Sequence, residues 1–204
     1  MPFVSFEGID GSGKTEQVRR LVSHLRAIGA DVLQTKEPDG GHIGLEVREI
    51  LIRDKRQLSA AEQLLLVSAA RYDHVRNVIA PALEKGRWVI SDRFVDSTYA
   101  FQVASSDVDL EPLFEVATNI VVGAVAPDIT FILDVPVAVA SARRFERGNE
   151  AADPSEALRD FEVIRCALLD LAHRNPGRCR VIDGDRPPEL VAAEILRNVE
   201  LLVP

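Results

Sequence analysis

The sequence predicts an α/β fold, a doubly wound, five-stranded parallel sheet with helices on both faces. Three observations support this prediction. Short apolar runs rich in β-branched and aromatic residues occur five times along the chain, and segments with helical spacing lie between them. A glycine-rich turn joins the first run to the first helix. Strands that alternate with helices form right-handed βαβ units, which place all strands in one parallel sheet covered on both sides.

The predicted strands and the first helix follow from local composition. The five strands are the runs Phe3–Phe6, Val32–Thr35, Trp88–Ser91, Thr130–Val135 and Arg180–Asp183. Short runs rich in Val, Ile and Phe are typical of strands that are buried on both faces. The first helix begins near Lys14, repeats apolar residues at helical spacing, and ends at Gly29, a helix-stopping residue.

Further helices lie between the later strands. Ser59 and Glu62 form a capping-box pair that opens one of them. We expect this helix to continue past Pro81, which bends it, and to end near Gly86. The remaining helices are predicted near residues 112–125, after Pro136, over 161–171 and from Pro188.

The whole chain, residues 1–204, is predicted to be a single domain, because no linker, repeat or low-complexity tract divides it. With 47% apolar and 27% charged residues it has the composition of a globular protein. Its net charge of −8 argues against binding to nucleic acid or to an anionic membrane, since both need clustered positive charge. Seven of the acidic residues lie between residues 94 and 142, where there is no Lys or Arg.

The sequence also predicts the compartment. The longest apolar run, Val116–Pro127, is too short to span a bilayer, and we expect its helical part, Val116–Val125, to lie in the core. The first residues do not have the pattern of a signal peptide. Cys166 and Cys179 form neither a disulfide framework nor a metal pattern, and we expect Cys166 to be buried. These features predict a cytoplasmic protein with no membrane partner.

The strongest motif is Gly8-Ile9-Asp10-Gly11-Ser12-Gly13-Lys14-Thr15, which fits G-x-x-x-x-G-K-[ST] between a predicted strand and a predicted helix. Its glycines let the backbone wrap around a phosphate with the N–H groups pointing inward. The helix N-terminus adds partial positive charge. Lys14 can reach the β- and γ-phosphates of a nucleotide, and the Thr15 hydroxyl is placed to bind Mg²⁺. The alternative is a glycine-rich turn that only connects strand and helix.

Two other strand ends carry polar clusters, and ligands of doubly wound sheets bind at this carboxyl edge. The third strand runs out into Asp92 and Arg93. The carboxylate can hold a water of Mg²⁺ and the guanidinium can clamp a phosphate, although a local surface pair is the alternative. After the second strand, Glu37-Pro38 and the turn Asp39-Gly40-Gly41 lay a carboxylate across the same edge, where an ordinary loop is the alternative.

An arginine-rich segment follows the fourth strand. Arg143, Arg144 and Arg147 cluster before a polar stretch of small residues, Gly148 to Ser155. We interpret residues 143–156 as a flap, because closure of a basic flap over phosphates excludes water and neutralises developing charge. A solvated, arginine-rich helix end is the alternative.

These segments, taken together, resemble the thymidylate kinase family of P-loop nucleoside monophosphate kinases over nearly the whole chain. The residues that carry the resemblance are Phe6-Glu7 with the glycine-rich loop, Lys36-Glu37-Pro38 with Gly40 and Gly44, Arg48, Ala69-Ala70-Arg71, Asp92-Arg93-Phe94 with Ser97, Ala100, Phe101 and Gln102, Leu133-Asp134-Val135, the arginine-rich helix and Val181-Ile182-Asp183. The most specific of these is the Asp-Arg-Phe segment with Ser97 and Gln102.

The resemblance implies transfer of the ATP γ-phosphoryl group to the 5′-phosphate of dTMP, which gives dTDP and ADP, with Mg²⁺ as cofactor. It implies that ATP binds to Gly8, Ile9, Asp10, Gly11, Ser12, Gly13, Lys14, Thr15 and Arg143, and that Thr15 and Asp92 serve the metal. It implies that dTMP binds to Asp10, Glu37, Pro38, Arg48, Val67, Arg71, Arg93, Ser97, Phe101 and Gln102.

Within this set the resemblance implies more specific roles. Arg48 and Arg93 bind the acceptor phosphate, and Asp10 and Glu37 lie near the sugar and the reacting centre. Arg71 and Gln102, assisted by Ser97, recognise the base. Position 11 is Gly, as in the family members that rely on flap arginines. This nominates Arg143 and Arg147 as catalytic residues beside Lys14, Arg93 and Asp10.

Several positions depart from the family pattern. Val67 stands where the family commonly has a Phe that stacks on thymine, and Phe101 stands where it often has Tyr. The Gly-Gly-Thr that follows Glu-Pro in the family reads Asp39-Gly40-Gly41 here. The Asp-Arg-x-Glu common in the flap is replaced by Asp153-Pro154-Ser155-Glu156.

These departures leave two alternatives open, a related monophosphate kinase with altered base preference and a nucleotide-binding P-loop protein with little kinase turnover. The expected partners are the small nucleotides ATP and dTMP, not nucleic acid. The resemblance also suggests a homodimer, with the helices near residues 60–80 and 112–125 as its candidate contact.

Overall fold

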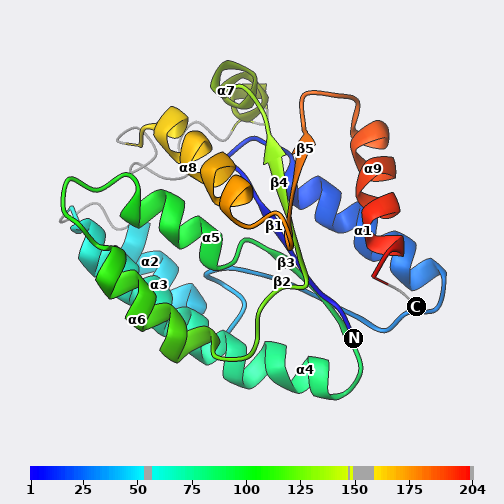
Figure 1. The fold of residues 1–204 in the computed structure, drawn as a ribbon, viewed down its shortest axis with the longest axis horizontal. Helices are drawn as coiled ribbons and strands as arrows, with labels where there is room; N and C mark the ends of the chain where they lie inside the picture. The colour runs from blue at the N-terminus through cyan, green and yellow to red at the C-terminus, as the bar shows by residue number, and fades with distance from the viewer. Residues whose placement is uncertain (53–56, 147, 149–158, 203–204) are drawn as a thin grey trace.

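The computed structural model describes residues 1–52, 57–146, 148 and 159–202. Its centre is one sheet of five strands in the order β2-β3-β1-β4-β5, with all neighbouring pairs parallel (Figure 1). The strands are β1 (Phe3–Glu7), β2 (Val32–Lys36), β3 (Trp88–Asp92), β4 (Ile129–Asp134) and β5 (Cys179–Asp183). The predicted fold class is confirmed, and each strand lies within one or two residues of its predicted bounds.

The central strands are buried on both faces, which explains why their sequences are apolar runs. All of β1 is buried, and the hydroxyls of two buried residues, Ser5 of β1 and Thr130 of β4, are hydrogen-bonded to each other at 2.8 Å. The strand ends are in register at the carboxyl edge, where Lys36 of β2 pairs with Asp92 of β3. Polar residues that follow different strands therefore meet at this edge.

Helices α1 (Lys14–Ala27) and α9 (Pro188–Glu200) cover one face of the sheet (Figure 1). The helical spacing predicted for α1 places Val18, Leu21, Val22 and Leu25 in the core, against strand residues such as Phe6 and Phe131. Burying side chains of this size contributes about 1.5–3 kcal/mol each. The α1 helix thereby fixes the glycine-rich loop that precedes it against the sheet.

The other face is covered by α3 (Ala60–His74), α4 (Ala80–Glu84), α5 (Val95–Thr98), α6 (Glu111–Val122) and α8 (Phe161–Arg174), with π-helical segments η1 (Val75–Ile79) and η2 (Tyr99–Val103). The capping box of Ser59 and Glu62 is present at the start of α3. The predicted long helix does continue past Pro81, but through the π-helical segment η1. Pro81 lies in the first turn of α4, where its missing N–H is tolerated.

Two sequence-based expectations about burial are wrong. Helix α6 was expected in the core, but Val116 and Ile120 on it are 59% and 66% exposed. Cys166 on α8 is exposed, and Cys179, at the start of β5, is the buried cysteine. The expectation for α6 is confirmed at Val121 and Val122, which are 9% and 8% exposed, and is wrong for the face that carries Val116 and Ile120.

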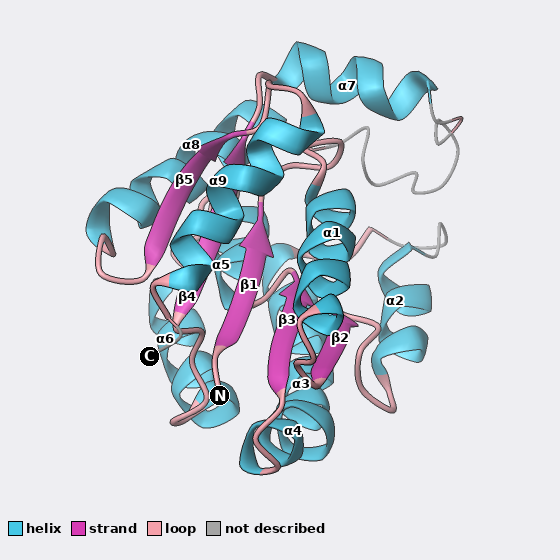
Figure 2. Ribbon diagram, turned by 90° about the vertical axis from the view of Figure 1, so that its right-hand side faces the viewer, coloured by secondary structure: helices cyan, strands magenta, loops and turns pink. Residues whose placement is uncertain are grey.

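Two helices lie beside the carboxyl edge of the sheet. Helix α7 (Val137–Glu146) crosses beyond the ends of β4 and β5, and α2 (Gly44–Ile52), which the sequence did not predict, follows the turn after β2 (Figure 2). Most of the predicted flap, residues 143–156, lies outside the described residues. Among the residues described, no helix is long and apolar enough to cross a membrane.

Candidate active site

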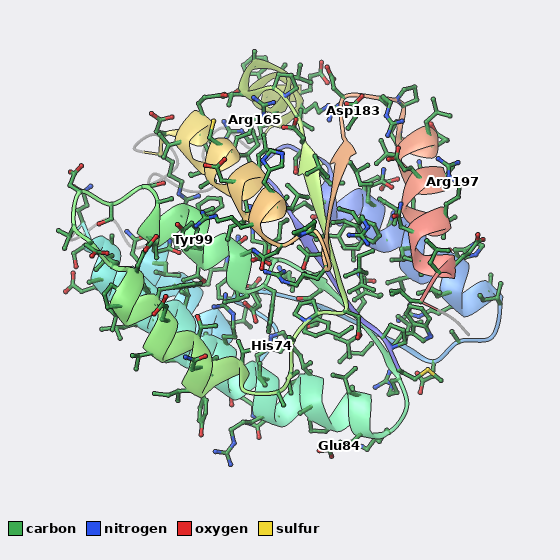
Figure 3. All side chains as sticks on the ribbon, viewed as in Figure 1. His74, Glu84, Tyr99, Arg165, Asp183 and Arg197 are labelled. Atoms are coloured by element: carbon green, nitrogen blue, oxygen red, sulfur yellow. The ribbon has the colours of Figure 1, made fainter. Side chains whose placement is uncertain are left out.

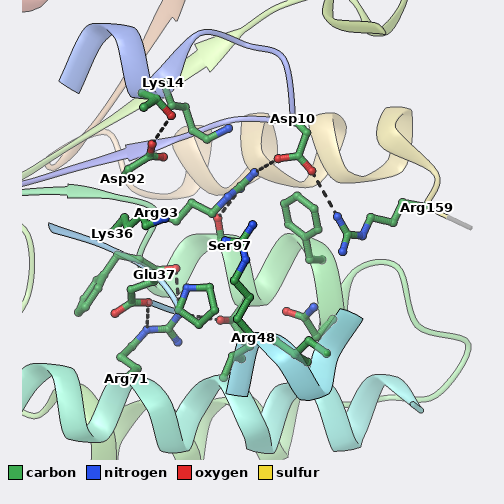
Figure 4. A pocket seen from close by; sticks show the side chains of 18 of the residues that line it. Asp10, Lys14, Lys36, Glu37, Arg48, Arg71, Asp92, Arg93, Ser97 and Arg159 are labelled. Carbon is green, nitrogen blue, oxygen red and sulfur yellow. Dashed lines mark hydrogen bonds and ion pairs between the residues drawn. The ribbon is translucent and has the colours of Figure 1, made fainter. Parts of the chain in front are cut away.

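A cavity of about 430 Å³ opens at the carboxyl edge of the sheet (Figure 4). It is bounded by the loop after β1, the segments that follow β2 and β3, and helices α2 and α3. Its lining residues are Asp10, Gly11, Gly13, Lys14, Thr15, Lys36, Glu37, Pro38, Arg48, Leu51, Ile52, Val67, Arg71, Asp92, Arg93, Phe94, Ser97, Thr98, Phe101, Gln102, Arg144 and Arg159. Fifteen of them belong to the predicted site, and Lys36, Phe94 and Arg144 are further residues among those that carry the resemblance.

The glycine-rich loop turns tightly from β1 into α1. Gly11 and Gly13 have φ angles of 91° and 94°, which side chains with a Cβ rarely adopt. A Cβ on Gly11 would lie 2.2 Å from the carbonyl oxygen of Ala140, so α7 packs directly against the loop. This contact leaves no room for a side chain at position 11, while the origin of a catalytic arginine elsewhere stays a prediction.

Lys14 lies inside this loop, and its side chain is buried. Its Nζ donates hydrogen bonds to the carbonyl oxygens of Gly8 and Ile9, at 3.0 and 2.9 Å. Burial and the neighbouring Arg93 lower the pKa of Lys14 to about 8. The ammonium group is therefore held at the N-terminus of α1, where it can bind an anion.

Thr15 and Asp92 form an oxygen pair at the start of α1 and the end of β3. The Thr15 hydroxyl donates to Asp92 Oδ2 at 2.6 Å. Hydroxyl and carboxylate oxygens are ligands that Mg²⁺ accepts. The described residues hold no cluster of three or more His, Cys, Asp or Glu that could bind a metal alone. This donor set fits Mg²⁺, which takes few protein ligands and completes its shell with water and phosphate oxygens.

Arg93 occupies the centre of the cavity. Its φ of 75° is unusual for a residue with a side chain and costs about 1–3 kcal/mol. The guanidinium compensates by donating to Gly8 O at 3.1 Å, to Ser97 Oγ at 2.9 Å, and to Asp10 (Figure 4). The strained backbone thus directs a partly buried cation at the glycine-rich loop.

Asp10 is held between two arginines, since Arg159 also reaches its Oδ2, at 3.3 Å. Burial disfavours the charged form of Asp10. The cations of Arg93, Lys14 and Arg159 outweigh burial and hold the pKa of this carboxyl well below its usual range. Asp10 is therefore a fixed negative charge between the glycine-rich loop and the arginines Arg93 and Arg159.

Glu7 is a fully buried carboxyl behind Arg93. It accepts hydrogen bonds from the Phe94 backbone N–H at 2.7 Å and from the Ser97 hydroxyl. Burial, reinforced by the nearby Asp96, raises the pKa of Glu7 to about 8. Because the Ser97 hydroxyl also accepts from Arg93, Ser97 connects Glu7 to Arg93, and this hydroxyl already has two protein partners.

Glu37 and Arg71 meet across the cavity floor. The Arg71 Nε donates to Glu37 at 2.7 Å, and its Nη2 donates to Phe94 O and to the Thr98 hydroxyl at 3.1 and 2.9 Å. Arg71 also lines the cavity, and its Nη1 has no hydrogen-bond partner among the described residues. Both Glu37 and Arg71 are almost fully buried, so their positions are well fixed.

His74 supports this ion pair from behind and lies in the interior of the molecule (Figure 3). Its Nδ1 is 3.1 Å from Glu37, and its Nε2 is 2.7 Å from the Thr35 hydroxyl. The sequence assigned no role to His74, because it has no neighbours at metal-ligand spacing. The structure makes it the link between β2, the Glu37-Pro38 segment and α3.

An apolar and amide wall completes the cavity with Val67, Phe101 and Gln102. The guanidinium carbons of Arg93 and Arg159 lie 4.8 and 5.5 Å from the centroid of the Phe101 ring. The Gln102 amide donates to Gln63 at 3.3 Å. Such a wall suits the flat face and polar edge of a nucleobase.

Most predicted site residues converge on this cavity, but the flap residue Arg143 does not. Arg143 donates to Gly184 O at 3.0 Å, beyond the end of β5, and is not part of the lining. Arg144, its neighbour, lines the cavity instead, and Arg147 lies outside the described residues. Ile9 is a core residue at 2% exposure, so only its backbone belongs to the loop.

Seven lining residues received no role from the sequence: Lys36, Leu51, Ile52, Phe94, Thr98, Arg144 and Arg159. Leu51 and Ile52 belong to α2, which has no capping signal. Arg159 contacts Asp10 across 149 positions, a separation that no local pattern reveals. Lys36, Phe94 and Arg144 directly adjoin the assigned residues Glu37, Arg93 and Arg143, and this adjacency was the available signal for them.

The geometry defines a class of protein. A phosphate-binding loop at the N-terminus of a helix faces, across one cavity, the arginines Arg48, Arg71 and Arg93. Two anion-binding halves in one cavity are the arrangement of a P-loop phosphotransferase whose acceptor carries a phosphate.

Comparisons with known proteins specify the family. The thymidylate kinase family model matches residues 6–195. The chain is 43% identical to thymidylate kinase from Dinoroseobacter shibae and 42% identical to that from Magnetococcus marinus. These alignments cover 96% and 97% of this chain and 95% of each relative. The crystal structure of thymidylate kinase from Ehrlichia chaffeensis is similar with a TM-score of 0.78 at 32% identity, covering 97% of this chain and 98% of that one. The chain belongs to the thymidylate kinase family.

Proposed function

We propose that the protein is an ATP:dTMP phosphotransferase that produces dTDP and ADP. The observation that carries this proposal is the single cavity in which Lys14 and the loop face Arg48, Arg71 and Arg93. Family membership over nearly the full chain supports dTMP as the acceptor and does not favour the alternatives of altered base preference or binding without turnover.

On the donor side, the backbone of residues 8–15 and the Lys14 ammonium bind the ATP phosphates. Thr15 and Asp92 hold Mg²⁺, which when bound neutralises charge on the phosphate oxygens. Asp10, anchored by Arg93 and Arg159, keeps the guanidinium of Arg93 at the junction of the two halves. Transfer needs this positioning rather than a general base, because the acceptor is already a phosphate anion.

On the acceptor side, Arg48 and Arg93 bind the phosphate of dTMP. Glu37 and Pro38 lie beside the sugar. The free Nη1 edge of Arg71, the amide of Gln102 and the apolar surface of Val67 and Phe101 receive the base. Ser97 acts through Arg93, because its hydroxyl is already engaged.

The arginines around the junction stabilise the charge that develops during transfer. Arg143 and Arg147 remain our proposal for this role, with Arg143 also on the donor side beside Gly184. Arg144 and Arg159 line the cavity and join this group. Each positively charged group near the transferring phosphoryl lowers the barrier by favouring the transition state over the ground state.

We further infer a homodimer in the cytoplasm that does not bind nucleic acid. The exposed apolar residues of α3 and α6 support the dimer, because these helices pack together and leave Leu65, Tyr72, Val116 and Ile120 exposed. The unpaired cysteines support a reducing compartment. The net charge of −8 opposes binding to a polyanion.

The decisive experiment is an acceptor panel. Release of ADP is measured with ATP, Mg²⁺ and each of dTMP, dUMP, UMP, CMP, AMP and GMP, with the Lys14→Ala variant as the background. We expect dTMP to give the highest kcat/KM. A higher value with another acceptor would overturn the thymidylate assignment, and no turnover with any acceptor would favour a nucleotide-binding protein.

A further inference from the structure

The turn after β2 carries a carboxylate, Asp39, at a position where the family pattern has glycine. Its side chain is only 6% exposed and contacts two cations. The Lys36 Nζ is 2.5 Å from Oδ2, and the Arg48 Nη1 is 3.2 and 3.3 Å from the two carboxylate oxygens. Both cations line the cavity, whereas Asp39 lies behind them.

The backbone of Asp39 is fixed by close packing. A Cβ on Gly44, the first residue of α2, would lie 2.0 Å from the Pro38 carbonyl oxygen and 2.9 Å from Asp39 Cα. The same turn is tied to α3, because Asp73 accepts hydrogen bonds from the backbone N–H groups of His42 and Ile43. Asp39 therefore has a defined position relative to α2, the helix that carries Arg48.

Asp39 engages only part of the Arg48 guanidinium. The contacts use Nη1, and Nε and Nη2 have no partner among the described residues. Arg48 and Lys36 are 50% and 57% exposed, so neither is held by burial (Figure 4). Without a carboxylate between them, these two flexible cations would repel each other and sample many rotamers.

We propose that Asp39 is a positioning residue that holds Arg48 and Lys36 on one wall of the cavity, with their remaining N–H groups directed at the acceptor phosphate. This inference rests on the proposed function. An arginine fork that is partly anchored loses less rotamer freedom when it binds a phosphate. If the carboxylate instead competes with the phosphate for Arg48, removal of its charge should lower the KM for dTMP rather than raise it.

The test uses Asp39→Asn, which removes the charge and keeps the shape, and Asp39→Gly, which restores the family residue. We expect the KM for dTMP to rise roughly threefold to tenfold in Asp39→Asn, with kcat and the KM for ATP within about twofold of wild type. We expect Asp39→Gly to behave in the same direction. The matched control is Asp31→Asn, because Asp31 pairs with Arg87 at 2.9 Å and is 69% exposed, away from the cavity. An unchanged or lower KM for dTMP in Asp39→Asn overturns the proposal.

A binding measurement separates positioning from a general structural effect. Calorimetric titration compares dTMP with thymidine, which has the same base and sugar and no phosphate. We expect Asp39→Asn to weaken dTMP and leave thymidine unchanged, and to have no further effect in an Arg48→Ala background. Equal weakening of both ligands overturns the proposal. If wild type does not phosphorylate dTMP, the proposed function fails, whereas a fully active wild type with an indifferent Asp39→Asn contradicts this inference alone.

Discussion

At the scale of the residue, Lys14 links the fold to phosphate binding. Its ammonium must be charged to bind phosphate, yet burial and Arg93 lower its pKa to about 8. The ammonium is therefore about half deprotonated near pH 8, and the charged form dominates below that pH. We expect kcat/KM for ATP, which reports the free enzyme, to be level below that pH and to fall above it.

Removal of the charge tests the same residue. We expect Lys14→Ala to lower kcat/KM by at least about 100-fold, as for other preorganised charges at a transferring group. Lys85→Ala is the matched control, because Lys85 is an exposed lysine that follows α4. Initial rates with varied ATP at pH 6.5 to 9.5 check both statements. A pH profile that stays flat to 9.5 would contradict the role given to Lys14.

Glu7 gives a second prediction, about stability. Burial and Asp96 raise its pKa from 4.5 to about 8, so between these values the folded protein binds more protons at this site than the unfolded chain. The contribution of Glu7 to the free energy of unfolding is complete below about pH 4.5. It declines as pH rises and is lost above about pH 8.

We expect the stability advantage of Glu7→Gln over wild type to grow across this window, because the amide mimics the protonated acid. Urea unfolding of both proteins at pH 5, 6, 7 and 8 measures it. Two curves with a constant separation would show that Glu7 does not titrate there.

The sequence predicted the location of those site residues that directly follow a strand in the chain. The glycine-rich loop and Asp92-Arg93 were placed correctly because each directly follows a strand, and strand ends meet at one edge. The contacts of Arg159 with Asp10 and of His74 with Glu37 were not predictable, because they join segments that only the tertiary structure brings together. The direction of Arg143, toward Gly184 rather than into the cavity, depends on where α7 lies.

At the scale of the element, α7 and the glycine-rich loop form one unit. The Ala140 carbonyl occupies the space that a side chain at position 11 would need. We expect Gly11→Ala to displace α7 or the loop, to destabilise the protein by about 1–3 kcal/mol, and to raise the KM for ATP.

Gly177→Ala provides the control for this prediction, because nothing lies within 4 Å of a Cβ at Gly177 and its φ is not in the left-handed region. Its free energy of unfolding should change by less than about 0.5 kcal/mol. Denaturant unfolding and ATP saturation curves check both variants. A Gly11→Ala protein with wild-type stability and KM would show that the contact with α7 is loose.

Elements were predictable where one pattern dominates. All five strands are apolar runs between turns, and α1 and α3 carry clear helical spacing or a capping box. Helix α2 was missed because its nine residues lack a capping signal, and the π-helical segments η1 and η2 depend on packing rather than on local propensity. The local sequence of α6 does not distinguish its exposed face from a core-facing one, because both are apolar, and only the family resemblance indicated residues 112–125 as a candidate dimer contact.

At the scale of the whole molecule, the distribution of charge explains how an acidic protein binds two anions. Seven of the acidic residues lie between residues 94 and 142, a segment without Lys or Arg. The arginines and lysines that line the cavity all lie outside that segment. A net charge of −8 therefore coexists with a local positive cavity, because charges beyond roughly 10 Å are screened by salt.

The exposed apolar residues of α3 and α6 yield the prediction for the assembly. Leu65, Val116 and Ile120 are 52%, 59% and 66% exposed, on helices that pack against each other. A stable dimer buries about 800 Å² on each partner with an apolar centre.

We expect the protein to sediment as a dimer at micromolar concentration. We expect Ile120→Glu to weaken association by at least about 100-fold, since it buries an unpaired charge. Leu190→Glu on α9 is the control, because Leu190 is 55% exposed on the opposite face of the sheet and its substitution should leave the dimer intact. Sedimentation velocity on the three proteins decides the matter. A monomeric wild type, or an Ile120→Glu protein that remains a dimer, would place the contact elsewhere or remove it.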